Sequence, residues 1–390
     1  MKAICYNAEL RDGMRFPDVI HIINFGRRTA LNAFFVLVPL YLLSAGFNGW
    51  QIGAVTALFA LAPLAFSFPV GWINDRISIK GVIRSALALE AVLFFLLSQV
   101  TDFLSLAVIF LLLGLGNNGL DVSINNYLYK DGAEESPNRK YGRLVFWSSL
   151  GTAVGPLAGG ALVAVASFEV MFAAFAAFLL LLQVFAGPLR PGRFAMVPIK
   201  AYGKNLLRKN TVLFSVMIFV IGLHWGVEGT VYSPFLKMNL GLSTIELSLY
   251  VTLSLLALAF SALLIGRLPS DLRQNQRLFT ISMALSGAGL ALMVIPVLPV
   301  SFAFRAVHEA GDGFLSALVV LFISRLFGKD SIGGSSALLL AVMTTGQMAG
   351  AMIFSSMGYR YGLAYPFIAA GALLTLNAGF ARFCFRRAEF

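Results

Sequence analysis

The sequence predicts an all-α polytopic membrane protein with twelve transmembrane helices in two six-helix bundles. Of its 390 residues, 58% are hydrophobic and only 12% are charged, and the mean hydropathy is +0.83. A soluble chain of this length needs more polar surface than this composition supplies. Apolar runs long enough to cross a bilayer also recur along the whole chain, and the polar breaks between them alternate in charge.

Twelve spans follow from these runs, and a longer break separates them into two sets. An N-terminal bundle is therefore predicted over 1–188, a cytoplasmic linker over 189–210 and a C-terminal bundle over 211–390. Two similar halves around a linker are typical of repeats related by an axis along the membrane normal. The predicted spans are 24–45, 51–72, 81–99, 104–129, 142–165, 169–188, 211–237, 245–267, 277–298, 301–327, 334–357 and 364–385.

The basic residues predict the topology. Breaks after the even-numbered spans are rich in Lys and Arg, whereas the others are poor in them, apart from Arg360 and the bordering Lys237. Cytoplasmic loops collect Lys and Arg, so both termini are expected in the cytoplasm of a cell (inner) membrane, and the net charge of +11 needs no nucleic acid to explain it. Cys5 and Cys384 both lie near predicted cytoplasmic ends, so no disulfide is expected. The first twenty residues lack the order of a cleaved signal.

The tenth span, 301–327, carries four ionisable side chains in an apolar setting. Arg305, His308, Glu309 and Asp312 are spaced by three and four, so they form one stripe on a helix. A charge in the hydrocarbon costs about 2.5 to 3.5 kcal/mol on insertion scales, so such groups face partners or a water-filled cavity. The stripe is predicted to line a transport path.

Spans 1, 4 and 7 carry further polar side chains inside the membrane. Glu90, Gln183 and Asn377 lie outside this set and are expected to make structural hydrogen bonds. The candidates for proton coupling are Asp121, Glu228, His308, Glu309 and Asp312. The candidates for the substrate cavity are Asn32, Asn117, Asn118, Asn125, His224, Trp225, Tyr232 and Arg305, with Arg27 and Arg28 near the cytoplasmic mouth.

The break after span 2 reads Gly-Trp-Ile-Asn-Asp-Arg-Ile-Ser-Ile-Lys. A glycine lets two helix ends approach, and an acid with two bases can pair across a closing interface. The break resembles the loop signature of the major facilitator superfamily, although it departs from it at Ser78 and Ile79. The resemblance implies a cytoplasmic latch of the outward-facing state, and a degenerate second copy is expected at 266–273. The signature positions are Gly71, Asp75, Arg76 and Lys80.

Span 5 carries a run of glycines and a Gly-Pro pair. These residues give a smooth face for close helix contact and a bend in the helix. The pattern resembles the antiporter motif of the drug:proton antiporter branch of the same superfamily, which implies that spans 1, 4, 7 and 10 line a central cavity. The alternative is close packing without a coupling role. The motif residues are Gly142, Gly151, Gly155, Pro156, Gly159 and Gly160.

These features lead to one main hypothesis and two alternatives. The main one is alternating-access, proton-coupled export (antiport) of a small organic or amphipathic compound, because a carboxylate in a low-dielectric cavity can take up a proton near neutral pH and a histidine can relay it. The first alternative is a divalent transition-metal transporter that uses His224, Glu228, His308 and Asp312 as ligands. The second is a carrier of an anionic metabolite or lipid-like substrate held by Arg305 or Arg28.

Other classes of function are not expected. The sequence shows no Walker loop and no catalytic triad, so neither an enzyme nor an ATP-driven pump is expected. The expected partners are a small-molecule substrate and the lipid bilayer, with no nucleic acid. No cofactor is expected besides the proton as coupling ion, and the chain is expected to act as a monomer.

Overall fold

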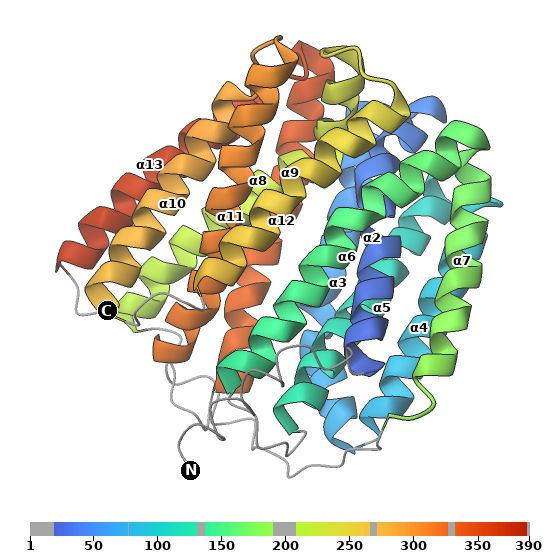
Figure 1. The fold of residues 1–390 in the computed structure, drawn as a ribbon, viewed down its shortest axis with the longest axis horizontal. Helices are drawn as coiled ribbons and strands as arrows, with labels where there is room; N and C mark the ends of the chain where they lie inside the picture. Colours follow the sequence, from blue (N-terminus) through green and yellow to red (C-terminus); the bar gives the residue numbers. More distant parts are fainter. Residues whose placement is uncertain are drawn as a thin grey trace, which may run out of the picture.

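The structure, a computed structural model, describes residues 19–76, 78–130, 137–189, 208–265, 271–326 and 332–387. Within these ranges the chain forms twelve α-helices and no strand, which confirms the predicted fold class. Figure 1 shows the first six helices grouped on one side and the last six on the other. The helices are α2 (Val19–Ser44), α3 (Gly49–Arg76), α4 (Ile79–Leu97), α5 (Phe103–Lys130), α6 (Pro137–Val165), α7 (Phe168–Phe185), α8 (Lys209–Met238), α9 (Thr244–Ile265), α10 (Leu272–Leu292), α11 (Leu298–Leu326), α12 (Ile332–Tyr361) and α13 (Tyr365–Arg387).

The helix bounds differ most from the prediction in α10. The span predicted over 277–298 begins five residues earlier and ends at Leu292. Asp271 starts the helix, because its carboxylate accepts a hydrogen bond of 2.9 Å from the backbone N–H of Gln274. The chain then turns after Met293, ahead of Pro296. The side chain of Asp271 thus serves as a local helix cap, while 266–270, the rest of the predicted second signature, lies outside the described residues.

Nine of the described helices are long and apolar enough to cross a membrane by length and composition. The other three described helices, α2, α4 and α10, fall short of that combination of length and apolar composition. The boundaries of the two bundles at 188 and 211 stay predictions, since most of the linker lies outside the described residues. The chain is therefore a multi-pass membrane protein.

The closest contacts between helices occur at glycines, and the contact of α6 with α2 shows why a larger residue would not fit. A Cβ on Gly151 would lie 2.3 Å from the carbonyl oxygen of Phe25, and one on Gly155 would lie 2.4 Å from that of Thr29, both on α2. No side chain fits at such distances, so glycine is required for α2 and α6 to approach. Gly160 lies in the same way against Ser248 of α9, in the other half of the chain.

The two halves contact each other through α3 with α12, α6 with α9 and α2 with α8. We call the end where α7 ends and α8 begins the linker end. At the opposite end, the hydroxyl of Ser355 donates a 2.6 Å hydrogen bond to the carbonyl of Gly49. One apolar core joins Phe34 and Tyr41 of α2 to Val231 of α8 there. A separate core inside the second half lies toward the linker end, so the described apolar contact between the halves is concentrated at the opposite end.

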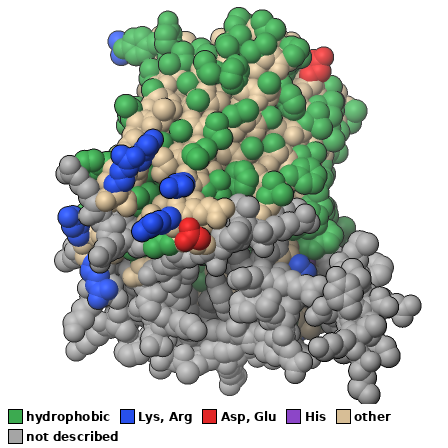
Figure 2. Space-filling model, turned by 60° about the vertical axis from the view of Figure 1, so that its left-hand side comes forward, with side chains coloured by type: hydrophobic (Ala, Val, Ile, Leu, Met, Phe, Trp, Pro, Cys, Tyr) green, Lys and Arg blue, Asp and Glu red, His purple; other side chains and the backbone are tan. Residues whose placement is uncertain are grey.

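Basic side chains of the described residues gather toward the linker end. Figure 2 shows them along the border of one largely hydrophobic face. Arg208, Lys209, Arg273 and Arg386 lie near helix ends on that side, whereas Lys237 and Arg360 lie at the opposite end. By the positive-inside rule, this bias is consistent with a cytoplasmic linker end. The orientation of the chain in an inner membrane stays a prediction. Cys384 is a free, buried thiol, and Cys5 lies outside the described residues.

Candidate functional site

An ion-pair cluster in the second half is centred on Arg305 of α11, whose side chain is only 2% exposed. Its guanidinium donates 2.6 Å to Oε1 of Glu228 on α8 and also bonds Oε1 of Glu309, one turn further along α11. The guanidinium carbon lies 4.0 Å from the ring centre of Tyr232. Arg305 therefore pairs with Glu309 of its own stripe and with Glu228, which α8 presents to α11.

His308 connects this cluster to a second group of polar side chains. Its ring is fully buried, and its Nε2 lies 2.8 Å from Oε1 of Glu228. Its Nδ1 lies 2.9 Å from both the hydroxyl and the carbonyl oxygen of Ser286 on α10. A carbonyl can only accept, so the network assigns a hydrogen to Nδ1. Nε2 therefore shares a proton with the Glu228 carboxylate, since two acceptors cannot face each other at 2.8 Å.

Asp312 lies at the other end of the same network. Its Oδ2 lies 3.0 Å from Nε2 of His224 and accepts a 3.0 Å bond from the indole N–H of Trp225. Its Oδ1 accepts a 2.6 Å bond from the hydroxyl of Ser286. With these three groups as donors, the network assigns an ionised carboxylate to Asp312 in this conformation. Ser286 thereby links His308 to Asp312 through one hydroxyl group.

Ser286 was missed in the sequence analysis. It lies in the run Ser-Gly-Ala-Gly of α10, which has the composition of an ordinary helix-packing face. That packing is what brings it to the site. A Cβ on Gly311 of α11 would lie 2.9 Å from Cβ of Ser286, and a Cβ on Gly289 would lie 2.7 Å from the backbone nitrogen of His308. Gly289 and Gly311, which allow the close contact of α10 with α11, were the sequence signal that could have pointed to Ser286.

Three of the four predicted metal ligands lie close together. One ligand atom each from His224, His308 and Asp312 lies within 4.8 Å of the others, and all three residues are buried. Nδ1 of His224 has no hydrogen-bond partner among the described residues. Glu228 joins the group through its contact with His308. The protein's own donors already satisfy Asp312, so metal binding there would require rearrangement, and it stays a prediction.

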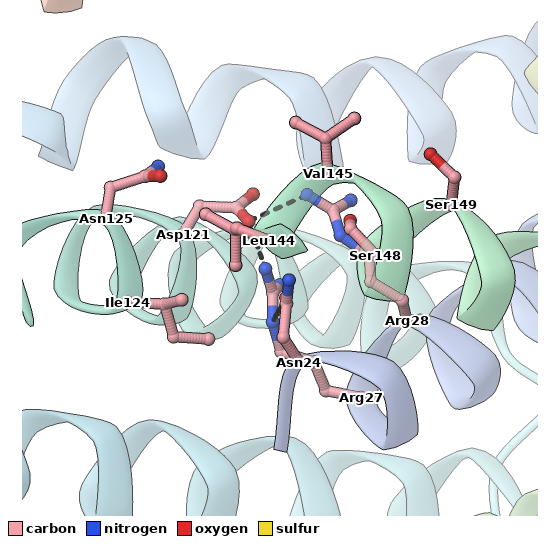
Figure 3. A pocket seen from close by; sticks show the side chains of 10 residues that line it. All are labelled: Asn24, Arg27, Arg28, Asp121, Ile124, Asn125, Leu144, Val145, Ser148 and Ser149. Atoms are coloured by element: carbon pink, nitrogen blue, oxygen red, sulfur yellow. Dashed lines mark hydrogen bonds and ion pairs between the residues drawn. The ribbon is translucent and has the colours of Figure 1, made fainter. Parts of the chain in front are cut away.

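A second polar cluster lies in the first half, around Arg27 of α2. This guanidinium donates 3.0 Å bonds to Asn24 and to Asn117 of α5, and it also bonds Oδ1 of Asp121. Arg28 donates 2.8 Å to the same oxygen. Figure 3 shows both guanidinium groups directed at Asp121. The carboxylate predicted to couple protons is thus held between two arginines in this conformation.

A cavity of about 150 Å³ opens beside this cluster, toward the linker end. It contains one residue predicted for the substrate cavity, Asn125, together with Asp121. Asn24, Ser148 and Ser149 were not singled out from the sequence, because isolated serines and amides near helix ends give no pattern. The lining residues are Asn24, Arg27, Arg28, Asp121, Ile124, Asn125, Leu144, Val145, Ser148 and Ser149.

Some remaining candidates make other contacts. Asn118 accepts a 2.9 Å bond from Ser67 of α3, and Asn32 lies against Gly155 of α6. Glu90 of α4 is 2% exposed and lies close enough to Arg27, Arg28 and Asp121 to interact with them electrostatically. Its Oε1 has no hydrogen-bond partner among the described residues. Gln183 and Asn377 make the expected structural hydrogen bonds, to the carbonyls of Arg84 and Met217.

Little of the predicted latch can be located. The ammonium of Lys80 bonds the carbonyl of Gly187, within the first half. Gly71, Asp75 and Arg76 lie in the last turns of α3 and Gly142 lies in α6, but the contacts of these four residues are outside the described set. The latch function therefore stays a prediction.

Comparison with protein-family models identifies one family. The model of the Major Facilitator Superfamily matches residues 20–198 and 214–390. A search of curated protein sequences finds no match. Among solved structures, a mutant of the nucleoside transporter NupG is similar with a TM-score of 0.79 and 15% identity, over 94% of this chain and 99% of that one.

Two further solved structures are similar over almost the whole chain. A bacterial homologue of the human lysosomal transporter Spinster, inward-facing and unoccupied, gives a TM-score of 0.76 and 15% identity, over 94% of this chain and 96% of that one. A POT family transporter in complex with a thioalcohol-conjugated peptide gives 0.78 and 13%, over 95% and 96%. At these identities the likeness shows the fold alone.

Proposed function

The chain belongs to the major facilitator superfamily and is a secondary transporter of small substrates, and from this premise we propose that it couples their transport to protons. The coupling site is the hydrogen bond between Glu228 and His308. The transport cycle is alternating access between the two helical halves. The proposed direction is export in exchange for protons.

The observation that carries this proposal is the single proton that Glu228 and His308 share. The Nδ1 hydrogen of His308 is committed to Ser286, so the proton between Nε2 and Oε1 is the one that can leave. When it leaves, Glu228, Glu309 and Asp312 are all ionised, with the guanidinium of Arg305 as the one fixed cation beside them. Burial makes that excess negative charge unfavourable, so proton release favours a rearrangement of α8 against α11.

The position of Glu228 explains how the proton reaches the site. Its side chain is 22% exposed, whereas those of Arg305 and His308 are at most 2% exposed. The next residue, Gly229, faces α3 of the first half. A Cβ on Gly229 would lie 3.3 Å from the methyl group of Thr56. A change of charge at Glu228 would therefore occur close to the contact between the halves. Alternating access requires that contact to change.

Export is the direction that the α6 glycines favour, through their likeness to the antiporter motif. These glycines hold α6 against α2 and α9, so they lie where the halves would move. With the linker end in the cytoplasm, the cavity beside Arg28 would open inward while Ser355 and Gly49 close the outer side. This is the state that would take up a substrate for export.

The test uses proteoliposomes with an acidic lumen and a trapped pH dye. Addition of panels of organic cations, anions and neutral compounds should release protons from wild-type vesicles. Glu228→Gln should abolish that release while it preserves substrate exchange in the absence of a pH gradient. Glu169→Gln, which changes an exposed carboxylate of α7, serves as the matched control. Undiminished proton release in Glu228→Gln would refute the coupling site.

Metal transport is a second candidate because His224, His308 and Asp312 approach within 4.8 Å. Equilibrium dialysis of the purified protein against Zn²⁺, Mn²⁺ and Co²⁺ tests it directly. Stoichiometric binding that is lost in His224→Ala would favour it over the proton hypothesis. The same dialysis without binding would remove it, and the proton proposal would be unaffected.

A further inference from the structure

We propose that the cavity beside Arg28 binds the negatively charged group of an organic anion, which would be the transported substrate. This inference rests on the proposed transport function and specifies its substrate class. The cavity contains two guanidinium groups, Arg27 and Arg28, against one carboxylate, Asp121. Glu90 is buried on α4 and is not among the lining residues. The lining of the cavity therefore has an excess of one positive charge.

The two arginines differ in how firmly they are held. Arg27 is 2% exposed and bonds three side chains, whereas Arg28 is 27% exposed and bonds only Asp121. Nε of Arg28 is buried and finds no hydrogen-bond partner within the part of the chain that the structure describes. Arg28 can therefore turn its guanidinium to a ligand while Arg27 keeps Asp121 neutralised. A bidentate guanidinium contact of this kind suits a carboxylate or a phosphate.

Other lining groups complete a site for an organic anion. The side chains of Asn125, Ser148 and Ser149 make no hydrogen bond to another described side chain, so their N–H and O–H groups are available to an anionic oxygen. Ile124, Leu144 and Val145 supply an apolar wall for the body of the molecule. A volume of about 150 Å³ suits a head group with a short carbon chain.

The cluster in the second half is not an equivalent site, although it also contains an arginine. Arg305 is 2% exposed, bonds Glu228 and Glu309, and lies over Tyr232. Its charge is already balanced by two carboxylates. Of the two arginines expected to hold an anionic substrate, the geometry therefore selects Arg28.

Equilibrium binding without any pH gradient tests this inference separately from proton coupling. The melting temperature of the detergent-purified protein would be followed against four probes of one chain length: hexanoate, hexyl phosphate, hexanamide and hexylamine. One or both anions should stabilise the protein, whereas the amide and the amine should not, and the comparison of the two anions identifies the head group. Arg28→Gln should weaken anion binding at least about tenfold, since a charged hydrogen bond is lost.

Two controls keep the test specific. Arg84→Gln removes an exposed arginine of α4 and should bind the anions as wild type does. Ser148→Ala with Ser149→Ala removes two donors without a change in charge, and should also weaken binding if Arg28→Gln proves unstable. The inference is overturned if hexylamine binds and the anions do not, if none of the four binds, or if the Arg28 and Ser148/Ser149 variants bind unchanged. Anion binding that persists in Glu228→Gln without proton release would support this site while the loss of coupling is assigned to Glu228.

Discussion

Nε2 of His308 on α11 and Oε1 of Glu228 on α8 lie 2.8 Å apart and share one proton, although the residues are 80 positions apart in the chain. The first half holds a contrasting pair. Arg27 and Arg28 bind Asp121 there, and guanidinium groups keep a fixed charge. Under the two proposals above, the second half would take up and release the proton and the first half would hold the substrate's charge.

Ser286→Ala should reduce proton-driven transport and change its pH profile. The substitution removes the hydroxyl between His308 and Asp312, and leaving buried partners unsatisfied costs about 1 to 3 kcal/mol. The matched control is Ser282→Ala, one turn earlier on α10 and equally buried, with no role in the network. Ser286 acts here as a positioning residue, so an unchanged pH profile with lower stability would assign it a packing role only.

Arg305→Met should destabilise the protein by about 3 to 5 kcal/mol, because it leaves the buried carboxylate of Glu309 without its cation and leaves Glu228 with His308 alone. Adding Glu228→Gln and Glu309→Gln to that variant should restore much of the loss, as the remaining groups are neutral. The stability of each variant is measured by thermal unfolding in the same detergent. Arg382→Met, an exposed arginine on α13, controls for loss of charge alone. Failure of the triple variant to recover would mean that Arg305 stabilises mainly through its contact with Tyr232.

Gly289→Ala should destabilise the α10–α11 contact by about 1 to 3 kcal/mol through overpacking. The added Cβ would lie 2.6 Å from the carbonyl oxygen of Phe304 and 2.7 Å from the nitrogen of His308. Gly379→Ala on α13 meets nothing within 4 Å, so it should be neutral or stabilising by about 0.5 to 1 kcal/mol. Melting temperatures that fall equally for both variants would contradict this account.

A disulfide across the opposite end should stop transport reversibly. A Cβ built on Gly53 would lie 3.1 Å from Cβ of Ser355 and 2.7 Å from the carbonyl oxygen of Ala351. A disulfide takes a Cβ separation of about 3.5 to 4.5 Å, so the pair comes within reach of one once α3 and α12 move slightly apart. Gly53→Cys with Ser355→Cys, in a chain with Cys5→Ser and Cys384→Ser, should therefore crosslink on oxidation and hold the halves together. Transport should cease when oxidised and return on reduction. Full transport by the crosslinked protein would show that α3 and α12 need not separate there.

Much of the fold was predictable because hydrophobic length and period are local properties of the chain. All twelve predicted spans correspond to described helices, and the largest difference, in α10, comes from a cap at Asp271 and a turn before Pro296. The stripe of α11 was predicted for the same reason, since a spacing of three and four fixes one helix face. Which residues would meet that face depended on neighbouring helices, so Glu228 as partner of Arg305 and the role of Ser286 were not predictable.

The sequence by itself determined that this chain spans a membrane repeatedly, and that charged groups on four of its helices must face inward, because lipid excludes unpaired charge. Only the tertiary structure decided how those groups divide. The glycine contacts of α10 with α11 place Ser286 between His308 and Asp312, and those of α6 with α2 place Ser148 beside Arg28. How closely two helices approach depends on packing between segments that are distant in the chain. The sequence of one span does not identify the helix that packs against it.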